Sequence, residues 1–321
     1  MLKNQGSNIF QQYKKLWVVI ILIAVLFVGG EITVGNFLSL GQVLLTVRMA
    51  SMIALFALCQ MIVMSSGGDG LDLSIGFNAT LTAVITASIM DGSNSNLFLA
   101  VITAVGLGAA IGLANGLFSA YMKLPPLIVT LAMGTILQGI INVYTAGANI
   151  TGRPSPMLAT LAAGTTGIFP NIVIMLIIVL ALVMIIMNKT SIGRRIFGVG
   201  ANERAAYLSG IDVRRTRLKS FVFSGIWASC MGLMLLGNMG IAFKDMGSNF
   251  IMPSIAAAVV GGVSMGGGEG NYLGVVLGSI FLQALTNLLV AFGWGDAGKW
   301  LGFGIVLFVM LLFYAREKRS K

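Results

Sequence analysis

The sequence predicts an all-α protein that crosses a membrane about ten times. Of its 321 residues, 57% are hydrophobic and 9% are charged, and the mean hydropathy is +0.95. A soluble domain carries about a quarter charged residues, so lipid must solvate most of this surface. The 42 glycines fit this interpretation, because glycine is frequent in membrane helices and lets them pack closely. Soluble folds are therefore excluded.

The ten spans are predicted from apolar runs, since crossing the hydrocarbon core takes about 20 helical residues. They cover residues 16–34, 44–65, 71–90, 97–121, 125–146, 168–187, 219–240, 251–264, 271–292 and 298–315. The eighth range is short, and polar residues interrupt the fifth. Lys14 and Lys15 precede the first range, as in a signal peptide, but no small-residue cleavage site follows. We therefore expect an uncleaved first helix.

The basic residues predict the orientation of the chain. With both termini in the cytoplasm, the cytoplasmic segments and Lys219 at their border hold 16 of the 20 Lys and Arg residues. These segments are 1–15, 66–70, 122–124, 188–218, 265–270 and 316–321. This distribution follows the positive-inside rule, so the net charge of +10 does not indicate a nucleic-acid partner. The chain is expected to be one transmembrane domain, 1–321, with its largest loop at 188–218.

Several kinds of chemistry are excluded or not expected. The chain has no histidine, which excludes a histidine dyad, a histidine metal site and a histidine pH switch. Cys59 and Cys230 lie in separate apolar runs and are expected to be small buried hydrophobic residues. The run from Gly293 to Lys299 matches the start of a phosphate-binding loop, but Trp300 replaces the required Ser or Thr. We expect a helix connector there, no catalytic residue, and no metal or cofactor bound by this chain.

Two glycine spacings predict close helix crossings. Gly108, Gly112 and Gly116 form two consecutive G-x-x-x-G steps in the fourth span, and Gly274 and Gly278 form one in the ninth. Such spacings let two helix backbones approach each other. Chance is the alternative in a chain so rich in glycine.

Neutral polar residues inside the spans are candidates for lining a translocation path, because they can pair with hydroxyl-rich solutes without a buried charge. They are Ser74, Asn78, Thr80, Asn115, Gln138, Asn142, Asn238, Gln283, Thr286 and Asn287. For each one, interhelical hydrogen bonding is the alternative. The interrupted span 125–146 is the best candidate for lining the path. No acidic residue is expected at a span centre, which argues against an ion-driven carrier without excluding it.

The stretch SSGGDGLDLSIG, residues 65–76, contains two of the ten acidic residues. The predicted topology places it at the cytoplasmic end, between the second and third spans. Asp72 is expected to cap the helix that follows, and Asp69, set between glycines, to occupy a turn with positive φ. A role of Asp72 and Ser74 in a cytoplasmic gate, or contact with an ATPase, is the alternative.

The loop 188–218 contains a short helix signal. Asn202 can cap the first turn, Glu203 lies at the positive end of the helix dipole, and Ala205 and Ala206 continue the helix. Gly210 suits its end. The helix is either a docking surface for a partner or part of a solvated basic loop.

Three stretches together resemble the membrane permeases of ribose- and galactose-type ABC importers. GGDGLDLSIG is similar to the G-G-I-D-L-S-V-G segment of that family. GRRIFGVGANERAAYLSGIDVRRTRLKSFVFSG and IAAAVVGGVSMGGGEGNYLGVVLGSIFLQALTNLL resemble two further family segments, in the same order along nearly the whole chain. The sequence departs from the family at GDGLD, where a single acid in GID is usual, and at Arg204, which follows Glu203.

The resemblance implies a vitamin-B12-importer-type helical fold and the permease role for a ribose- or galactose-like monosaccharide. It also implies a second permease copy or a related paralogue, and a cytosolic ATPase with two nucleotide-binding domains for ATP and Mg²⁺. The resemblance further implies that an extracytoplasmic sugar-binding protein delivers the substrate and that the chain lies in the bacterial inner membrane. By the same analogy, 188–218 is the coupling loop, with the residues Arg194, Arg195, Asn202, Glu203, Arg204, Ala205, Ala206 and Gly210. The alternatives are a permease for a nucleoside, an autoinducer-type sugar or an amino acid, an ion-coupled carrier, and a channel or scaffold.

Overall fold

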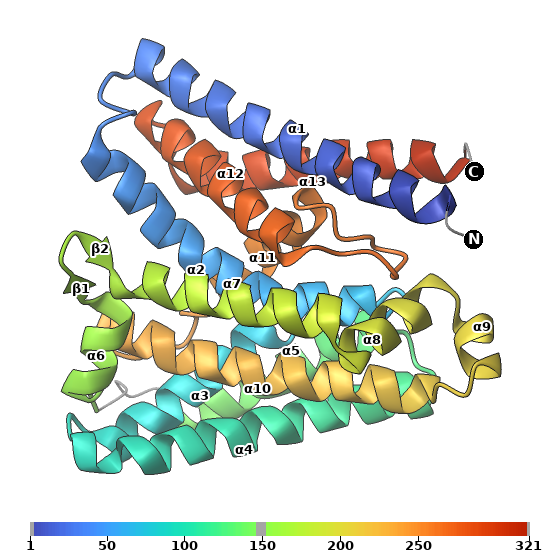
Figure 1. Cartoon of the computed structure of the whole chain (residues 1–321). Coiled ribbons are helices and arrows are strands. Elements are labelled where there is room, and N and C mark those ends of the chain that lie inside the picture. Colours follow the sequence, from blue (N-terminus) through green and yellow to red (C-terminus); the bar gives the residue numbers. More distant parts are fainter. Residues whose placement is uncertain (1–2, 146–151, 320–321) are drawn as a thin grey trace.

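The computed structural model describes residues 3–145 and 152–319 and is a bundle of helices with one small hairpin (Figure 1). The first half contains α1 (Lys3–Thr33), α2 (Leu40–Ser65), α3 (Ile75–Met90), α4 (Leu97–Gly116), α5 (Pro126–Thr145) and α6 (Pro156–Ala163). The hairpin of β1 (Thr165–Thr166) and β2 (Phe169–Pro170) leads to α7 (Asn171–Lys189), α8 (Ser191–Ala201) and α9 (Glu203–Leu208). The chain continues through α10 (Val213–Met239), α11 (Ile251–Val260), α12 (Tyr272–Ala291) and α13 (Gly295–Arg319). Short helical turns are η1 (Asn94–Asn96), η2 (Leu117–Tyr121) and η3 (Ser248–Phe250).

Each of the ten predicted spans contains one α-helix, but not all ten are full spans. Among the described residues, seven helices are long and apolar enough to cross a membrane: α1, α2, α4, α5, α7, α10 and α12. The third and eighth ranges hold α3 and α11, which have 16 and 10 residues, fewer than the roughly 20 that a span needs. The chain is therefore a multi-helical membrane protein, whereas ten full spans stay a prediction.

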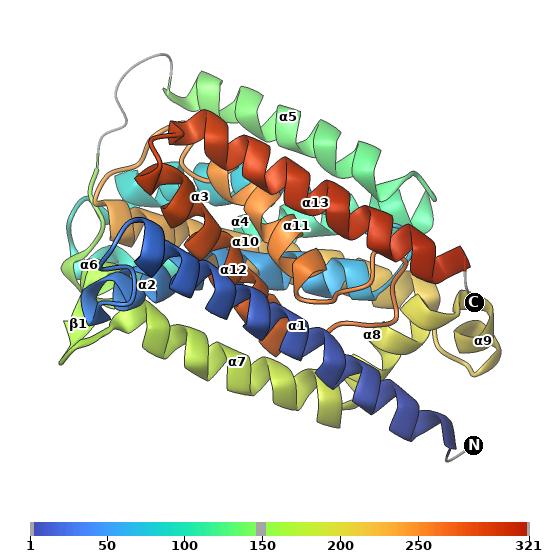
Figure 2. The ribbon, with the colours of Figure 1, turned by 90° about the horizontal axis from the view of Figure 1, so that it is seen from above.

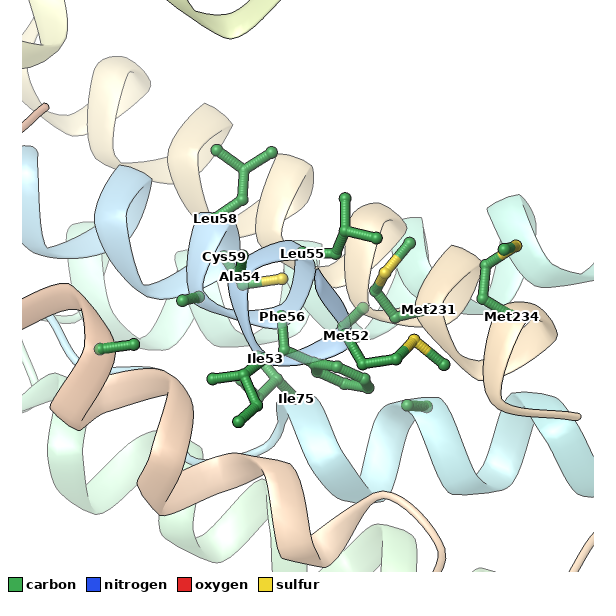
Figure 3. Packing of buried hydrophobic residues seen from close by; sticks show 14 of the residues in the cluster. Met52, Ile53, Ala54, Leu55, Phe56, Leu58, Cys59, Ile75, Met231 and Met234 are labelled. Carbon is green, nitrogen blue, oxygen red and sulfur yellow. The ribbon is translucent and has the colours of Figure 1, made fainter. Parts of the chain in front are cut away.

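The centre of the bundle consists of α2 and α10. In their most apolar windows, 83% of the α2 residues and 72% of the α10 residues are buried, against 17% in α1. Figure 3 shows α2 side chains packed beside Met231 and Met234 of α10. Cys59 is fully buried among them, as predicted, and Cys230 is half-buried. Helices such as α1 instead cover the outside and present apolar side chains to lipid.

Two non-helical segments enter the bundle from its two ends and lead into the short helices. Residues 66–74 follow α2 and precede α3, and residues 240–247 follow α10 and precede η3 and α11. The second segment contacts α3, the helix that follows the first segment, where the Gly247 N–H donates to Thr80 Oγ1 at 3.0 Å. A Cβ on Gly76 would lie 2.5 Å from the Gly247 carbonyl oxygen, so only glycine permits this contact. Such broken helices are tolerated at membrane depth because protein surrounds them.

The predicted glycine crossings are confirmed. A Cβ on Gly108 would lie 2.4 Å from the Gly225 carbonyl oxygen of α10, and one on Gly112 would lie 2.4 Å from that of Phe221. In the second case, a Cβ on Gly274 would lie 2.1 Å from the carbonyl oxygen of Gly261, which follows α11. Glycine therefore allows α4 to touch α10 and α12 to touch the end of α11, and van der Waals packing stabilises both contacts.

The start of α1, the end of α13, α8 and α9 lie at one end of the bundle, and the hairpin β1–β2 lies at the other (Figures 1 and 2). The predicted cytoplasmic segments 66–70, 188–218 and 265–270 come together at the first end. The structure therefore agrees with the grouping of these segments on one side.

Candidate functional site

The carboxylate of Asp72 lies inside the bundle, where the residue is 1% exposed. Its Oδ1 accepts from the Ser74 hydroxyl at 2.6 Å and from the Ser74 N–H at 3.1 Å, and its Oδ2 accepts from the Ser224 hydroxyl at 2.7 Å. On α2, the Gln60 side chain donates to the Asp72 carbonyl at 2.7 Å and accepts from its N–H at 3.2 Å. A buried carboxylate needs such partners. The network therefore fixes segment 66–74 to both central helices.

This position corrects the expectation for Asp72. The N-cap of α3 is Ser74, and no side-chain hydrogen bond caps that helix, so the predicted capping role is wrong. Ser224 lies 11 residues into α10, about 16 Å from the helix start at 1.5 Å per residue. The predicted seventh span begins at Lys219, so Ser224 lies only five residues, roughly 7.5 Å, inside it. Asp72 is therefore buried near the end of the spans and not at a span centre, because the chain turns back into the bundle before α3 begins. Asp69, by contrast, has φ = 51°, and its predicted turn is confirmed.

Two other candidate path residues join the same buried region. Asn115 of α4 donates from Nδ2 to the Ser74 hydroxyl at 2.9 Å, and its Oδ1 has no partner among the described residues. Asn78 donates from Nδ2 to the Gly225 carbonyl at 2.9 Å and accepts from the Ser229 hydroxyl at 2.7 Å. Asp72, Ser74, Asn78 and Asn115 are thus buried and bonded between helices. These four residues form hydrogen bonds between helices, which was the alternative prediction, and do not line an open surface.

The remaining path candidates lie elsewhere. Gln138 and Asn142 are exposed on one face of α5. Asn287 of α12 is half-buried, donates to the Thr46 hydroxyl of α2 at 2.9 Å and accepts from Gln283 at 2.8 Å. The structure therefore does not bring the predicted path residues together, and of the ten neutral candidates only Gln138 and Asn142 are exposed to a solute.

The predicted helix in loop 188–218 is confirmed as α9. The Asn202 side chain accepts from the Ala205 N–H at 2.9 Å, and Glu203 lies in the first turn. At the other end, Gly210 has φ = 79°, and the N–H groups of Gly210 and Ile211 donate to the carbonyls of Tyr207 and Ala206. This is the Schellman ending that glycine permits. Caps at both ends therefore hold a helix of only six residues.

Two glycine-rich turns and the end of α8 meet at the base of this loop. A Cβ on Gly200, at the end of α8, would lie 2.1 Å from the Ser65 carbonyl oxygen and 2.3 Å from the Gly268 nitrogen. A Cβ on Gly267 would lie 2.5 Å from the Cα of Gly67. The Gly268 N–H also donates to the Ser65 carbonyl at 3.1 Å. We call this contact of residues 65–68, 199–201 and 267–268 the glycine junction.

Arg217, on α10, connects α9 to the glycine junction. Its Nη2 lies 3.0 Å from Glu203 Oε2, and its Nε donates to the Ser66 carbonyl at 3.3 Å. In the sequence, Arg217 contributed only to the predicted orientation, and this connection was not predicted. Gly200 was also missed as a contact residue, although the glycine pairs Gly67-Gly68 and Gly267-Gly268 in the two turns were a usable signal.

The other predicted coupling residues differ in how far their side chains are exposed. Arg194, Arg195 and Arg204 are exposed, whereas Ala206 is 5% exposed and packs with Val199 and Val213. On α9 itself, Tyr207 and Leu208 are 71% and 77% exposed. The loop therefore presents cations and two large apolar side chains at the end of the bundle, on a base anchored by Ala206.

Comparison with known proteins gives the following matches. The family model described as branched-chain amino acid transport system / permease component matches residues 42–315. The ribose import permease protein RbsC of Haemophilus influenzae is 32% identical over 298 residues, which cover 90% of each chain. The galactose/methyl galactoside import permease protein MglC of Escherichia coli is 31% identical over 94% of this chain and 95% of its own. The fructose import permease protein FrcC of Rhizobium meliloti is 28% identical over 90% of this chain and 82% of its own. No solved structure matches.

Proposed function

Because this chain belongs to the permease family of branched-chain amino acid transport systems, and resembles sugar import permeases over most of its length, we propose that it carries a monosaccharide across the membrane as one subunit of an ATP-driven importer. It is a permease subunit and not itself an enzyme. ATP and Mg²⁺ would be held by a separate cytosolic ATPase, and an extracytoplasmic binding protein would deliver the sugar. The membrane is the bacterial inner membrane in this proposal.

The observation that carries the proposal is the glycine junction. It joins the base of the capped helix α9 to the turns at 65–68 and 267–268. Each turn continues into a membrane-buried part of the bundle, one through segment 66–74 to α3 and the other to α12. A partner that moves α9 would therefore shift parts of both halves of the chain. This is the connection that an importer driven from outside the permease requires.

The exposed side chains of α9 fit a docking role. Tyr207 and Leu208 project from a helix whose caps and whose buried Ala206 prevent it from reorienting freely. Tyr and Arg are residue types enriched in interface hot spots, and α9 exposes both Tyr207 and Arg204. We propose that Tyr207 and Leu208 insert into the ATPase, and that Arg217 passes the displacement from Glu203 to Ser66.

The exposed polar face of α5 fits a path shared with a second permease. Thr135, Gln138 and Asn142 follow one another at helical spacing of three and four residues and are exposed. Amide side chains facing lipid are unfavourable, so this face is expected to meet protein or water. A second copy placed against α5 would enclose a path with amide groups for sugar hydroxyls. The binding protein would then set most of the specificity.

Transport measurements test the proposal. The tagged chain, purified with its co-purifying subunits, is reconstituted in proteoliposomes with ATP on the cytoplasmic side. Labelled ribose, galactose and fructose are supplied on the other side with the cognate binding protein. We expect uptake that vanadate abolishes and a protonophore leaves intact. Uptake that a protonophore abolishes and vanadate leaves intact would instead identify an ion-coupled carrier, which the buried Asp72 keeps as an alternative.

A further inference from the structure

A cavity of about 680 Å³ lies between α7, α8 and α10, at the end of the bundle that carries α9. Its walls are mostly apolar and include Ile62, Val183, Ile186, Met187, Ile192 and Phe223. The cavity is separate from the buried network around Asp72 and from the exposed face of α5. Its size is in the range of small-molecule sites.

The polar side of the cavity is positively charged. Arg195, Arg215 and Lys219 line it, and Asp212 is the one acidic lining residue that the structure describes. Asp212 is already paired with Arg215 at 3.0 Å. Arg195 and Lys219 make no hydrogen bond or ion pair with the described part of the chain. Two cations are therefore available to an anion at this edge.

The apolar side of the cavity is continuous with the surface that faces lipid. Ile185 and Ile186 of α7 are 56% and 41% exposed, and Ile192 of α8 is 57% exposed. Thr190 alone separates α7 from α8, so α8 begins where the membrane-spanning helix ends. A helix in this position, with exposed isoleucine beside exposed arginine, is typical of the membrane interface.

We propose that this cavity binds one anionic phospholipid. The phosphate would lie between Arg195 and Lys219, and an acyl chain would lie along Ile186, Ile192 and Phe223. Basic pockets between helices on the cytoplasmic side bind anionic headgroups, and the apolar wall distinguishes a lipid from a water-soluble phosphate. A sugar has no partner on that wall. The inference does not depend on the transported solute.

A tryptophan beside the cavity provides the test. The rings of Trp227 and the lining residue Phe223 are stacked with centroids 6.1 Å apart. In the variant W17F/W294F/W300F of the full chain, Trp227 is the one remaining tryptophan. The variant is reconstituted in phosphatidylcholine vesicles that contain roughly 10 mol% of brominated phosphatidylglycerol or brominated phosphatidylcholine. This low fraction keeps annular contact low. We expect stronger quenching of Trp227 by the brominated anionic lipid.

The controls remove the same charge in two places. Each cation near an anionic headgroup changes binding by about fivefold, so R195Q/K219Q should weaken the preference for phosphatidylglycerol by more than an order of magnitude. R194Q/R214Q removes two charges from the same end but from outside the cavity and should retain the preference. If the tryptophan variant does not fold, native mass spectrometry of the wild-type chain and both double variants counts bound phosphatidylglycerol instead. Equal quenching by both lipids, or equal loss in both double variants, overturns the proposal and leaves the cavity to a protein partner.

Discussion

Arg217 joins Glu203 to Ser66, with its Nη2 3.0 Å from the Glu203 carboxylate and its Nε 3.3 Å from the Ser66 carbonyl. One side chain thus ties the first turn of α9 to the end of α2. The Arg217 side chain is 20% exposed and that of Glu203 is 60% exposed. Exposed ion pairs contribute about 0–1 kcal/mol to stability. The contact therefore matters for the position of α9 more than for folding.

The first prediction concerns this ion pair. Glu203→Lys places two cations side by side and should reduce sugar-stimulated ATP turnover and uptake about tenfold, equivalent to about 1.4 kcal/mol of coupling. Thermal unfolding should change little, because the substituted Glu203 side chain is 60% exposed. In the reconstituted complex, E203K/R217E restores opposite charges and should recover part of the uptake. Normal uptake by E203K at equal expression would contradict the coupling role, and no recovery by the double variant would contradict the positioning role of Arg217.

The second prediction concerns the glycine junction. Gly200→Ala would place a methyl group 2.1 Å from the Ser65 carbonyl oxygen, and such overpacking costs about 1–3 kcal/mol. We expect a lower unfolding temperature and reduced uptake. Gly198→Ala on the same helix is the matched control, because the nearest atom to its Cβ would be 3.9 Å away. It should be neutral or slightly stabilising, since alanine is the better helix former. Equal unfolding temperatures for the two variants in detergent would show that the junction is not closely packed.

The third prediction concerns the buried carboxylate. Asp72→Ala removes the acceptor for three donors, on Ser74 and Ser224. Each buried donor left unpaired costs about 1–3 kcal/mol, so the free energy of unfolding should fall by about 3 kcal/mol or more. Ser224→Ala removes one of these bonds, leaves Asp72 Oδ2 without its hydroxyl donor, and should cost about 1–3 kcal/mol. Unfolding monitored by fluorescence gives both values. Lost transport by D72A at unchanged stability would instead identify a gate.

The fourth prediction concerns the exposed face of α5. In a C59A/C230A background, which removes both free thiols, Gln138→Cys should form a disulfide-linked dimer in membranes treated with oxidant. Ile102→Cys on α4 is equally a membrane-helix position, 52% exposed, and should stay monomeric. Dimers at Ile102 and none at Gln138 would place the second copy against α4 and reject the path at α5.

Much of the fold followed from local sequence. Apolar runs placed one helix in each predicted span, and Asn202 and Gly210 marked the ends of α9, because caps act within one turn. The spacing of Gly108 and Gly112 likewise predicted a close crossing, although not its partner, α10. The position of Asp72 was not predictable in this way. A polar turn between two apolar runs predicts an exposed loop, whether or not the chain turns back into the bundle.

The sequence by itself determined that this chain is a helical membrane protein, where its apolar helices and α9 lie, and where the basic end lies, because hydropathy, capping and charge placement act over a few residues. Only the tertiary structure decided which distant residues meet. Arg217 with Glu203, Gly200 with Gly268, and Asp72 with Ser224 are contacts between segments separated along the chain. Such contacts depend on how the helices cross. Close glycine packing and the pairing of a buried carboxylate select among the possible crossings, and both act only once the helices have packed.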